Sequence, residues 1–126
     1  MTDNSAHSVL VVEDDPDIRR LVTMVLKREG YRTETASDGV EAVLKLGAAE
    51  YDVIVLDLMM PNLDGFTFIN QLAESQPDRL RNVIVTSAAS PALIRQRTNG
   101  QTFRVLPKPF DIHELVAAVR SCIAQS

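Results

Sequence analysis

Three short, unbroken runs of apolar residues constrain the fold of this chain more than any other feature. They are Val9–Val12, Val53–Leu56 and Val83–Val85, and each has the length of a strand rather than of a helix. A strand that is apolar at every position, instead of at alternate positions, is typical of a parallel sheet that is covered on both faces. The runs therefore predict an α/β protein with a parallel sheet at its centre.

Amphipathic segments alternate with these runs and predict the helices. The clearest has apolar residues at helical spacing from Ile18 to Val25, and a shorter and weaker segment, Pro91–Thr98, has only Leu93 and Ile94 as apolar anchors. The other predicted helices are centred on Val40–Leu44, Ile69–Ala73 and Leu115–Ile123. Two segments of mixed polarity, Arg32–Ala36 and Phe103–Leu106, have the composition of edge strands.

Five strand–helix units in this order predict a doubly wound, five-stranded parallel sheet with helices on both faces. The order 2-1-3-4-5 places the three apolar strands in the middle and the two mixed strands at the edges. A chain of 126 residues, 45% of them hydrophobic, suffices for one such domain. We expect residues 8–126 to form it and the polar residues 1–7 to be a disordered tip.

Charge and cysteine content narrow the functional classes. The net charge is −4, from 13 basic and 17 acidic residues, which argues against a nucleic-acid backbone as the main partner. A single cysteine, Cys122, cannot form an internal disulfide, so a reducing cytoplasm is the expected location. No apolar run approaches the roughly 18 residues that a membrane-spanning helix needs.

Residues with reactive or metal-binding side chains follow the predicted strands at their carboxyl ends, where ligands bind in sheets of this kind. Glu13 and Asp14 follow the first strand, and Asp57 follows the third. Strands one and three are neighbours in the proposed order, so these three carboxylates should meet in one cleft. Ser87 at the fourth strand and Lys108 after the fifth would add a hydroxyl and an ammonium group.

This combination predicts a phosphoryl-transfer site that binds Mg²⁺. Carboxylates that crowd together must protonate or bind a cation, and a set of oxygen ligands alone suits Mg²⁺ better than zinc. Asp57 directly follows four apolar residues, so its burial without a function would be costly. Glu13 and Asp14, taken alone, are equally consistent with a solvated turn, and Asp15 is better explained as a helix cap than as a ligand.

From about residue 8 to residue 124, the chain resembles the receiver domain of bacterial response regulators in two-component signalling. The matching segments, in order, are Val11–Asp15, Val55–Gly65, Val85–Ala88 and Lys108–Phe110. The resemblance implies a flavodoxin-like fold, whose strand order 2-1-3-4-5 is already known from flavodoxin and from chemotaxis receivers.

The resemblance also implies a role for each site residue. Asp57 would be the phosphoacceptor, and Lys108 and Ser87 would contact the phosphoryl group. Mg²⁺ would be bound by Asp14 and Asp57 directly, by Glu13 largely through water, and by the backbone carbonyl of Met59. The peptide bond between Lys108 and Pro109 is expected to be cis, both from the resemblance and because a tight turn must direct Lys108 into the cleft.

Two positions depart from the family pattern. Val105 stands where many receivers have an aromatic switch residue, and Ala118 replaces an arginine found in the last helix of transcription-factor receivers. We therefore expect the phosphorylation signal to change the loop after Ser87 and the helix Pro91–Thr98. The responding surface would include Leu93, Ile94 and Arg97, with Phe103 beside it.

Three functions are compatible with these residues. A stand-alone receiver would take its phosphoryl group from a histidine kinase or phosphotransfer protein and act on a downstream protein; a start at Met1 and an end at Ser126 favour this reading. The alternative is a receiver cut from a longer regulator with a DNA-binding or enzymatic output domain. An enzyme is disfavoured: an aspartate-nucleophile phosphatase would need a second acid where Met59 stands, and the acidic loop after the first strand would repel a flavin phosphate.

Overall fold

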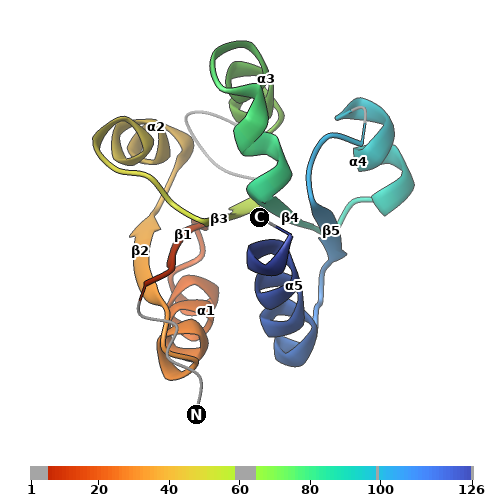
Figure 1. Cartoon of the computed structure of the whole chain (residues 1–126). Helices are drawn as coiled ribbons and strands as arrows, with labels where there is room; N and C mark the ends of the chain where they lie inside the picture. Colours follow the sequence, from red (N-terminus) through yellow and green to blue (C-terminus); the bar gives the residue numbers. More distant parts are fainter. Residues whose placement is uncertain (1–5, 59–64, 99, 126) are drawn as a thin grey trace.

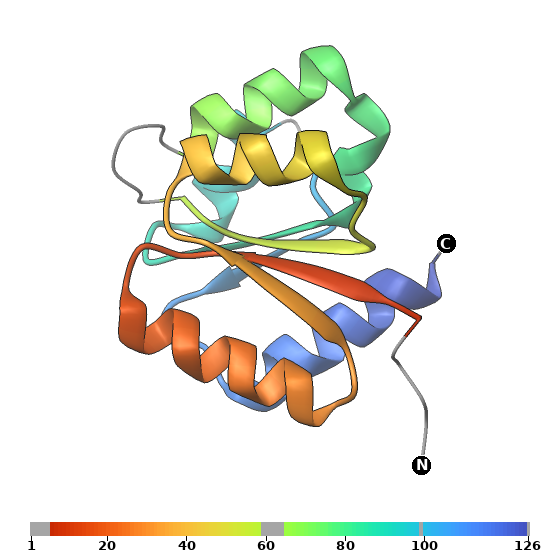
Figure 2. The same cartoon turned by 90° about the vertical axis from the view of Figure 1, so that its left-hand side faces the viewer.

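The computed structural model describes residues 6–58, 65–98 and 100–125, and these form a single five-stranded sheet. All strand pairs are parallel and the order is β2-β1-β3-β4-β5, so the predicted fold class and strand order are confirmed. The strands are β1 (Ser8–Val12), β2 (Arg32–Ala36), β3 (Val53–Asp57), β4 (Val83–Ser87) and β5 (Arg104–Pro107). Their carboxyl ends lie together, on the left of Figure 2.

Helices cover both faces of the sheet (Figure 1). A 3₁₀ helix precedes β4. The first face carries α1 (Pro16–Arg28) and α5 (Ile112–Ala124); the second carries α2 (Gly39–Ala48), α3 (Gly65–Ser75) and α4 (Pro91–Arg97); the 3₁₀ helix is η1 (Pro77–Asn82). No helix in the described ranges combines the length and apolarity needed to cross a bilayer.

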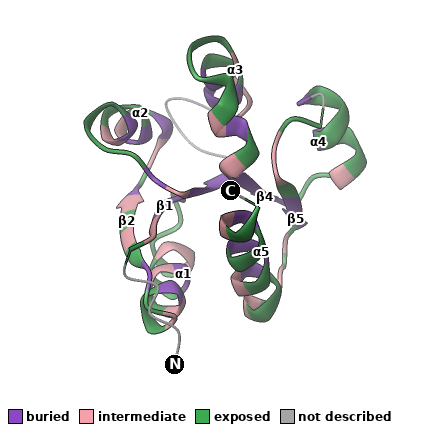
Figure 3. Ribbon diagram, in the orientation of Figure 1, coloured by how far each residue is buried: buried purple, intermediate pink, exposed green. Residues whose placement is uncertain are grey.

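The apolar strands divide the core into two layers, because successive side chains of a strand point to opposite faces. Val9 and Val11 pack with Leu26 of α1 on one face, whereas Leu10 and Val12 contribute to the cluster on the other. Figure 3 shows the buried residues concentrated in the sheet and on the inner sides of the helices. The continuous apolarity of β1, β3 and β4 thus reflects burial from both sides.

Capping residues determine where α1 begins and ends. The Asp15 side chain accepts hydrogen bonds from the Asp17 and Ile18 amides, at 2.8 and 3.3 Å. At the other end, Gly30 has a φ of 94°, in the left-handed region that favours glycine. Its amide and that of Tyr31 donate to the last free carbonyls of the helix. Asp15 is therefore occupied as a helix cap, as the sequence indicated.

The chain before β1 is placed from Ala6 onward. The His7 carbonyl accepts a hydrogen bond from the Arg32 amide at 3.1 Å, and the His7 ring lies 3.6 Å from Asp52. The predicted disordered tip covered residues 1–7, of which 1–5 lie outside the described residues. For those five residues, disorder stays a prediction.

The structure corrects the expected responding surface around α4. Ile94 is completely buried, so it anchors the helix to the core instead of contributing to the surface, whereas Leu93 is 48% exposed. Phe103 packs against the cluster under α1 and α5, on the opposite face of the sheet from Ile94. The sequence prediction erred because two apolar neighbours on a short helix give no indication of which one faces the core.

Ile94→Ala is expected to lower the free energy of unfolding by about 2–5 kcal/mol, since it removes a fully buried side chain. Leu93→Ala, one residue earlier, should lower it by less than about 1 kcal/mol because that side chain is half exposed. Guanidinium unfolding of the two variants measures the difference. Equal losses would show that Ile94 is not the anchor of α4.

Candidate functional site

Parallel pairing brings the ends of four strands to one edge of the sheet. Asp57, the last residue of β3, is in register with Thr86 of β4, and Ser87 is in register with Pro107 of β5. On the other side of β3, β1 ends at Val12, and Glu13 continues its ladder by donating its amide to the Ala36 carbonyl at 3.1 Å. The Lys108 amide donates to the Ser87 carbonyl at 2.7 Å.

Three carboxylates meet at this edge, as the strand order predicted. One oxygen each from Glu13, Asp14 and Asp57 lies within 4.8 Å of the others. Glu13 and Asp57 are buried, with 4% and 3% of their surfaces exposed, whereas Asp14 faces solvent. The group therefore has two buried members and one accessible member at the mouth of the site.

Lys108 supplies the positive charge at this acidic group. Its ammonium Nζ lies 3.2 Å from Glu13 Oε2 and 3.5 Å from Asp57 Oδ1. The peptide bond that follows it, Lys108-Pro109, is cis. A single ammonium thus contacts both buried carboxylates, which places a cation beside the Asp57 oxygen.

The crowded charges perturb Glu13. Its pKa is raised to about 7, chiefly because burial disfavours the charged form and further because Asp57 lies close by; Lys108 acts in the opposite direction. One lysine therefore does not compensate fully for two buried carboxylates. A divalent cation beside the group would favour the charged form of all three acids.

The donor set fits a hard divalent cation. All three side chains offer carboxylate oxygens, the ligands that Mg²⁺ prefers, and no histidine or cysteine accompanies them within this group. Three protein carboxylates with an exposed member leave room for water ligands, which Mg²⁺ usually keeps. Met59, whose carbonyl was predicted to complete the set, lies outside the described residues.

Ser87 and Thr86 are both buried at the end of β4. The Ser87 hydroxyl oxygen accepts a hydrogen bond from the Ala89 amide at 3.0 Å, so its own hydrogen can still be donated. Val105 is buried in the same cluster as Ile94, with its backbone in register with Val85. The predicted switch position thus contributes an aliphatic side chain to the core under α4.

Arg19 was not singled out from the sequence, yet it supports the acidic loop. Its guanidinium donates to the carbonyls of Glu13 and Asp14, at 2.9 and 3.5 Å, from the second turn of α1. These bonds orient the two residues that follow β1. The sequence offers no sign of this role, because Arg20 follows Arg19 on the same helix. Only the tertiary structure shows which of the two arginines contacts the loop.

Comparison with known proteins identifies the family. The family model described as response regulator receiver domain matches residues 9–120 of the chain. The chain belongs to the response regulator receiver family. Receivers are modules of two-component signalling, and the acidic group at the carboxyl ends of β1 and β3 is consistent with that role.

The similarity covers nearly the whole receiver. The chain is 34% identical over 126 residues to the transcriptional regulatory protein ResD of Bacillus subtilis (strain 168), with all of this chain and 52% of ResD covered. The receiver domain of the Francisella response regulator 1452 superposes with a TM-score of 0.85 at 32% identity, covering 94% of this chain and 98% of that one. Response regulator TrrA of Thermotoga maritima, solved in complex with Mg²⁺-BeF, gives a TM-score of 0.81 at 29% identity, covering 92% and 98%. The receiver thus spans about half the length of its relative ResD.

Proposed function

We propose that this receiver accepts a phosphoryl group on Asp57 with the help of Mg²⁺. The observation that carries the proposal is the meeting of Asp57 with Glu13, Asp14 and Lys108 at the carboxyl ends of the strands. Mg²⁺ would be held by Glu13, Asp14, Asp57 and the Met59 carbonyl. When bound, it supplies positive charge that neutralises the transferring phosphoryl oxygens.

The chain's own residues account for the transfer. A carboxylate oxygen of Asp57 attacks phosphorus, and the bond between phosphorus and the donor breaks, with its electron pair going to the donor. The Lys108 ammonium, 3.5 Å from the Asp57 oxygen, offsets the negative charge that the group brings. No second acid stands at Met59 to protonate a leaving group, which supports a signalling role instead of an independent phosphatase activity.

Phosphorylation would then change the surface near β4. The new group adds roughly −1.5 to −2 charges and three acceptor oxygens. The Ser87 hydroxyl and the Lys108 ammonium are the donors available to these oxygens. A rotation of the Ser87 side chain would break the hydrogen bond that its oxygen now accepts from the Ala89 amide. Val105 has too small and stiff a side chain to act as a rotating partner, so we expect the loop after Ser87 and α4 to respond.

Mapping the modified residue tests the proposal. The protein is incubated with acetyl phosphate and Mg²⁺, digested at acidic pH and analysed by mass spectrometry. A phosphoryl adduct on Asp57 that disappears when Mg²⁺ is chelated is the expected result. An adduct on another residue, or labelling at full yield without a divalent cation, would overturn it.

Asp14→Ala is expected to weaken Mg²⁺ binding by more than about tenfold, because it removes the accessible member of the acidic group. The neighbouring Asp15→Ala should leave Mg²⁺ affinity within about twofold and instead lower the free energy of unfolding by about 0.5–2 kcal/mol, since Asp15 caps α1. Mg²⁺ titration and guanidinium unfolding of both variants separate the two roles. Equal losses of Mg²⁺ affinity would contradict this assignment.

The phosphoryl donor would be a histidine kinase or a phosphotransfer protein, and the receiver would pass its signal to a downstream protein. A second candidate places this receiver in a longer regulator with an output domain, which is supported by its coverage of only 52% of ResD. The two candidates differ in the recipient of the signal and share the same chemistry at Asp57.

A further inference from the structure

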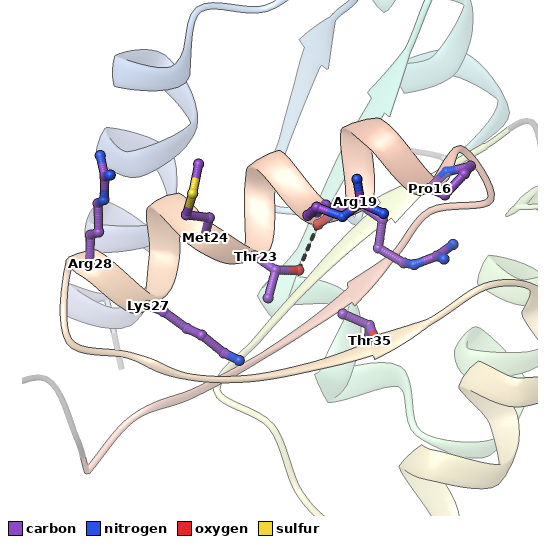
Figure 4. A pocket seen from close by; sticks show the side chains of 8 residues that line it. Pro16, Arg19, Thr23, Met24, Lys27, Arg28 and Thr35 are labelled. Atoms are coloured by element: carbon purple, nitrogen blue, oxygen red, sulfur yellow. Dashed lines mark hydrogen bonds between the residues drawn. The ribbon is translucent and has the colours of Figure 1, made fainter.

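A shallow groove of about 570 Å³ runs along α1 on the side of β2, from Pro16 and Arg19 beside the Glu13–Asp14 loop to Arg28 (Figure 4). Thr23 and Lys27 extend from the helix toward β2, whereas Met24 and Arg28 lie along its other flank. Four of the lining side chains are cationic: Arg19, Arg20, Lys27 and Arg28. The lining contains no acidic residue. This concentration of positive charge stands on a chain whose net charge is −4.

Two of these cations have no acidic partner among the described residues. In the described part of the chain, neither Lys27 nor Arg28 forms an ion pair. Arg20 lies 3.7 Å from Asp17, but both side chains are largely exposed, so the pair is weak. The groove therefore presents positive charge that the protein itself leaves mostly uncompensated.

The groove reaches the edge of the sheet at Thr35, the β2 residue in its lining, whereas Thr33 lines a neighbouring hollow with Glu34 and Glu50. β2 is an end strand, and the Arg32 amide and the Ala36 carbonyl are bonded toward β1. The backbone groups of Thr33 and Thr35 consequently face away from the sheet. Lys45 of α2 occupies the Thr35 carbonyl, and nothing in the described ranges bonds to the Thr33 amide and carbonyl or to the Thr35 amide. An extended peptide can pair with such an edge.

We propose that the groove between α1 and β2 is a docking site for an extended, acidic peptide segment of a partner protein. Its backbone would pair with Thr33 and Thr35, and its carboxylates would meet the cations of α1. The lining runs from Pro16 to Arg28, about 18 Å along the helix axis. That length matches five or six residues of extended chain, at about 3.3 Å each.

The lining favours a peptide over a nucleic acid. It includes no aromatic side chain on which a base could stack. Thr23, on the flank that faces β2, lies between Arg19 and Lys27 along the helix and suits a small side chain of a strand. The proposal does not depend on phosphorylation of Asp57.

The test uses a fluorescent seven-residue peptide of alternating glutamate and valine. We expect saturable binding to the whole chain, with slower hydrogen exchange of the Thr33 and Thr35 amides in the complex. The double variant Lys27→Glu/Arg28→Glu should bind about tenfold more weakly. The matched control, Arg81→Glu/Arg95→Glu, changes the charge equally at exposed positions on η1 and α4 and should bind like the parent. Arg19 is left intact because it also holds the Glu13–Asp14 loop.

Three results would overturn the proposal. The first is absence of binding by the glutamate peptide at millimolar concentration. The second is an equal loss of affinity in both double variants, which indicates diffuse charge attraction. The third is tighter binding of a single-stranded oligodeoxythymidine that slows exchange of the same two amides, which assigns the groove to a nucleic acid.

Discussion

Asp57→Ala is expected to abolish labelling of the receiver by acetyl phosphate in the presence of Mg²⁺, down to the background of the reagent. The substitution removes the attacking oxygen, and neither Glu13 nor Asp14 can replace it. Glu13 is buried against Lys108 with a pKa raised to about 7, and Asp14 would be a ligand of the metal. Phosphoryl incorporation, measured by intact-protein mass spectrometry, checks the prediction.

The control for this variant is another aspartate with a side chain outside the site. Asp17→Ala, in the exposed first turn of α1, should leave labelling unchanged, because the Asp17 side chain is largely exposed and lies 3.7 Å from Arg20, outside the acidic group. Asp57→Ala should itself fold, since it removes one of two buried carboxylates and with it the repulsion that, after burial, contributes to the raised pKa of Glu13. Undiminished labelling of a folded Asp57→Ala protein would refute the assignment of the phosphoacceptor.

Gly65→Ala is expected to lower the free energy of unfolding by at least about 2 kcal/mol. A Cβ at this position would lie 2.5 Å from the Cα of Leu58, which is a backbone atom and cannot move aside as a side-chain tip can. The Gly65 amide also donates to the Leu58 carbonyl at 3.0 Å, and Leu58 directly follows Asp57. We therefore expect the variant to disturb the site as well as the fold.

Gly47→Ala provides the matched comparison. Gly47 lies inside α2, and an added Cβ would meet nothing within 4 Å. Alanine at such a helical position should raise the free energy of unfolding by about 0.5–1 kcal/mol. Guanidinium unfolding of the two variants should therefore move in opposite directions. A stabilised Gly65→Ala protein would show that the backbone of Leu58 does not lie against Gly65.

Much of the architecture follows from local sequence. β1, β3 and β4 are apolar at nearly every position, so only a sheet covered on both faces can bury them. Asp15 and Gly30 define the two ends of α1 through local chemistry that needs no tertiary context. The 3₁₀ helix η1 was not predicted, because its residues show neither a helical nor an alternating apolar pattern.

The sequence by itself determined that acidic residues follow two strands and a lysine follows a third, and the strand order then implied that they meet. Only the tertiary structure decided which contacts result. It buries Ile94 and exposes Leu93, packs Phe103 on the face opposite α4, and directs Arg19 to the Glu13–Asp14 loop. Strand composition is local and is fixed by burial of both faces. The direction of a single side chain depends on how each helix is rotated against the sheet, and that rotation is set by packing between residues far apart in the chain.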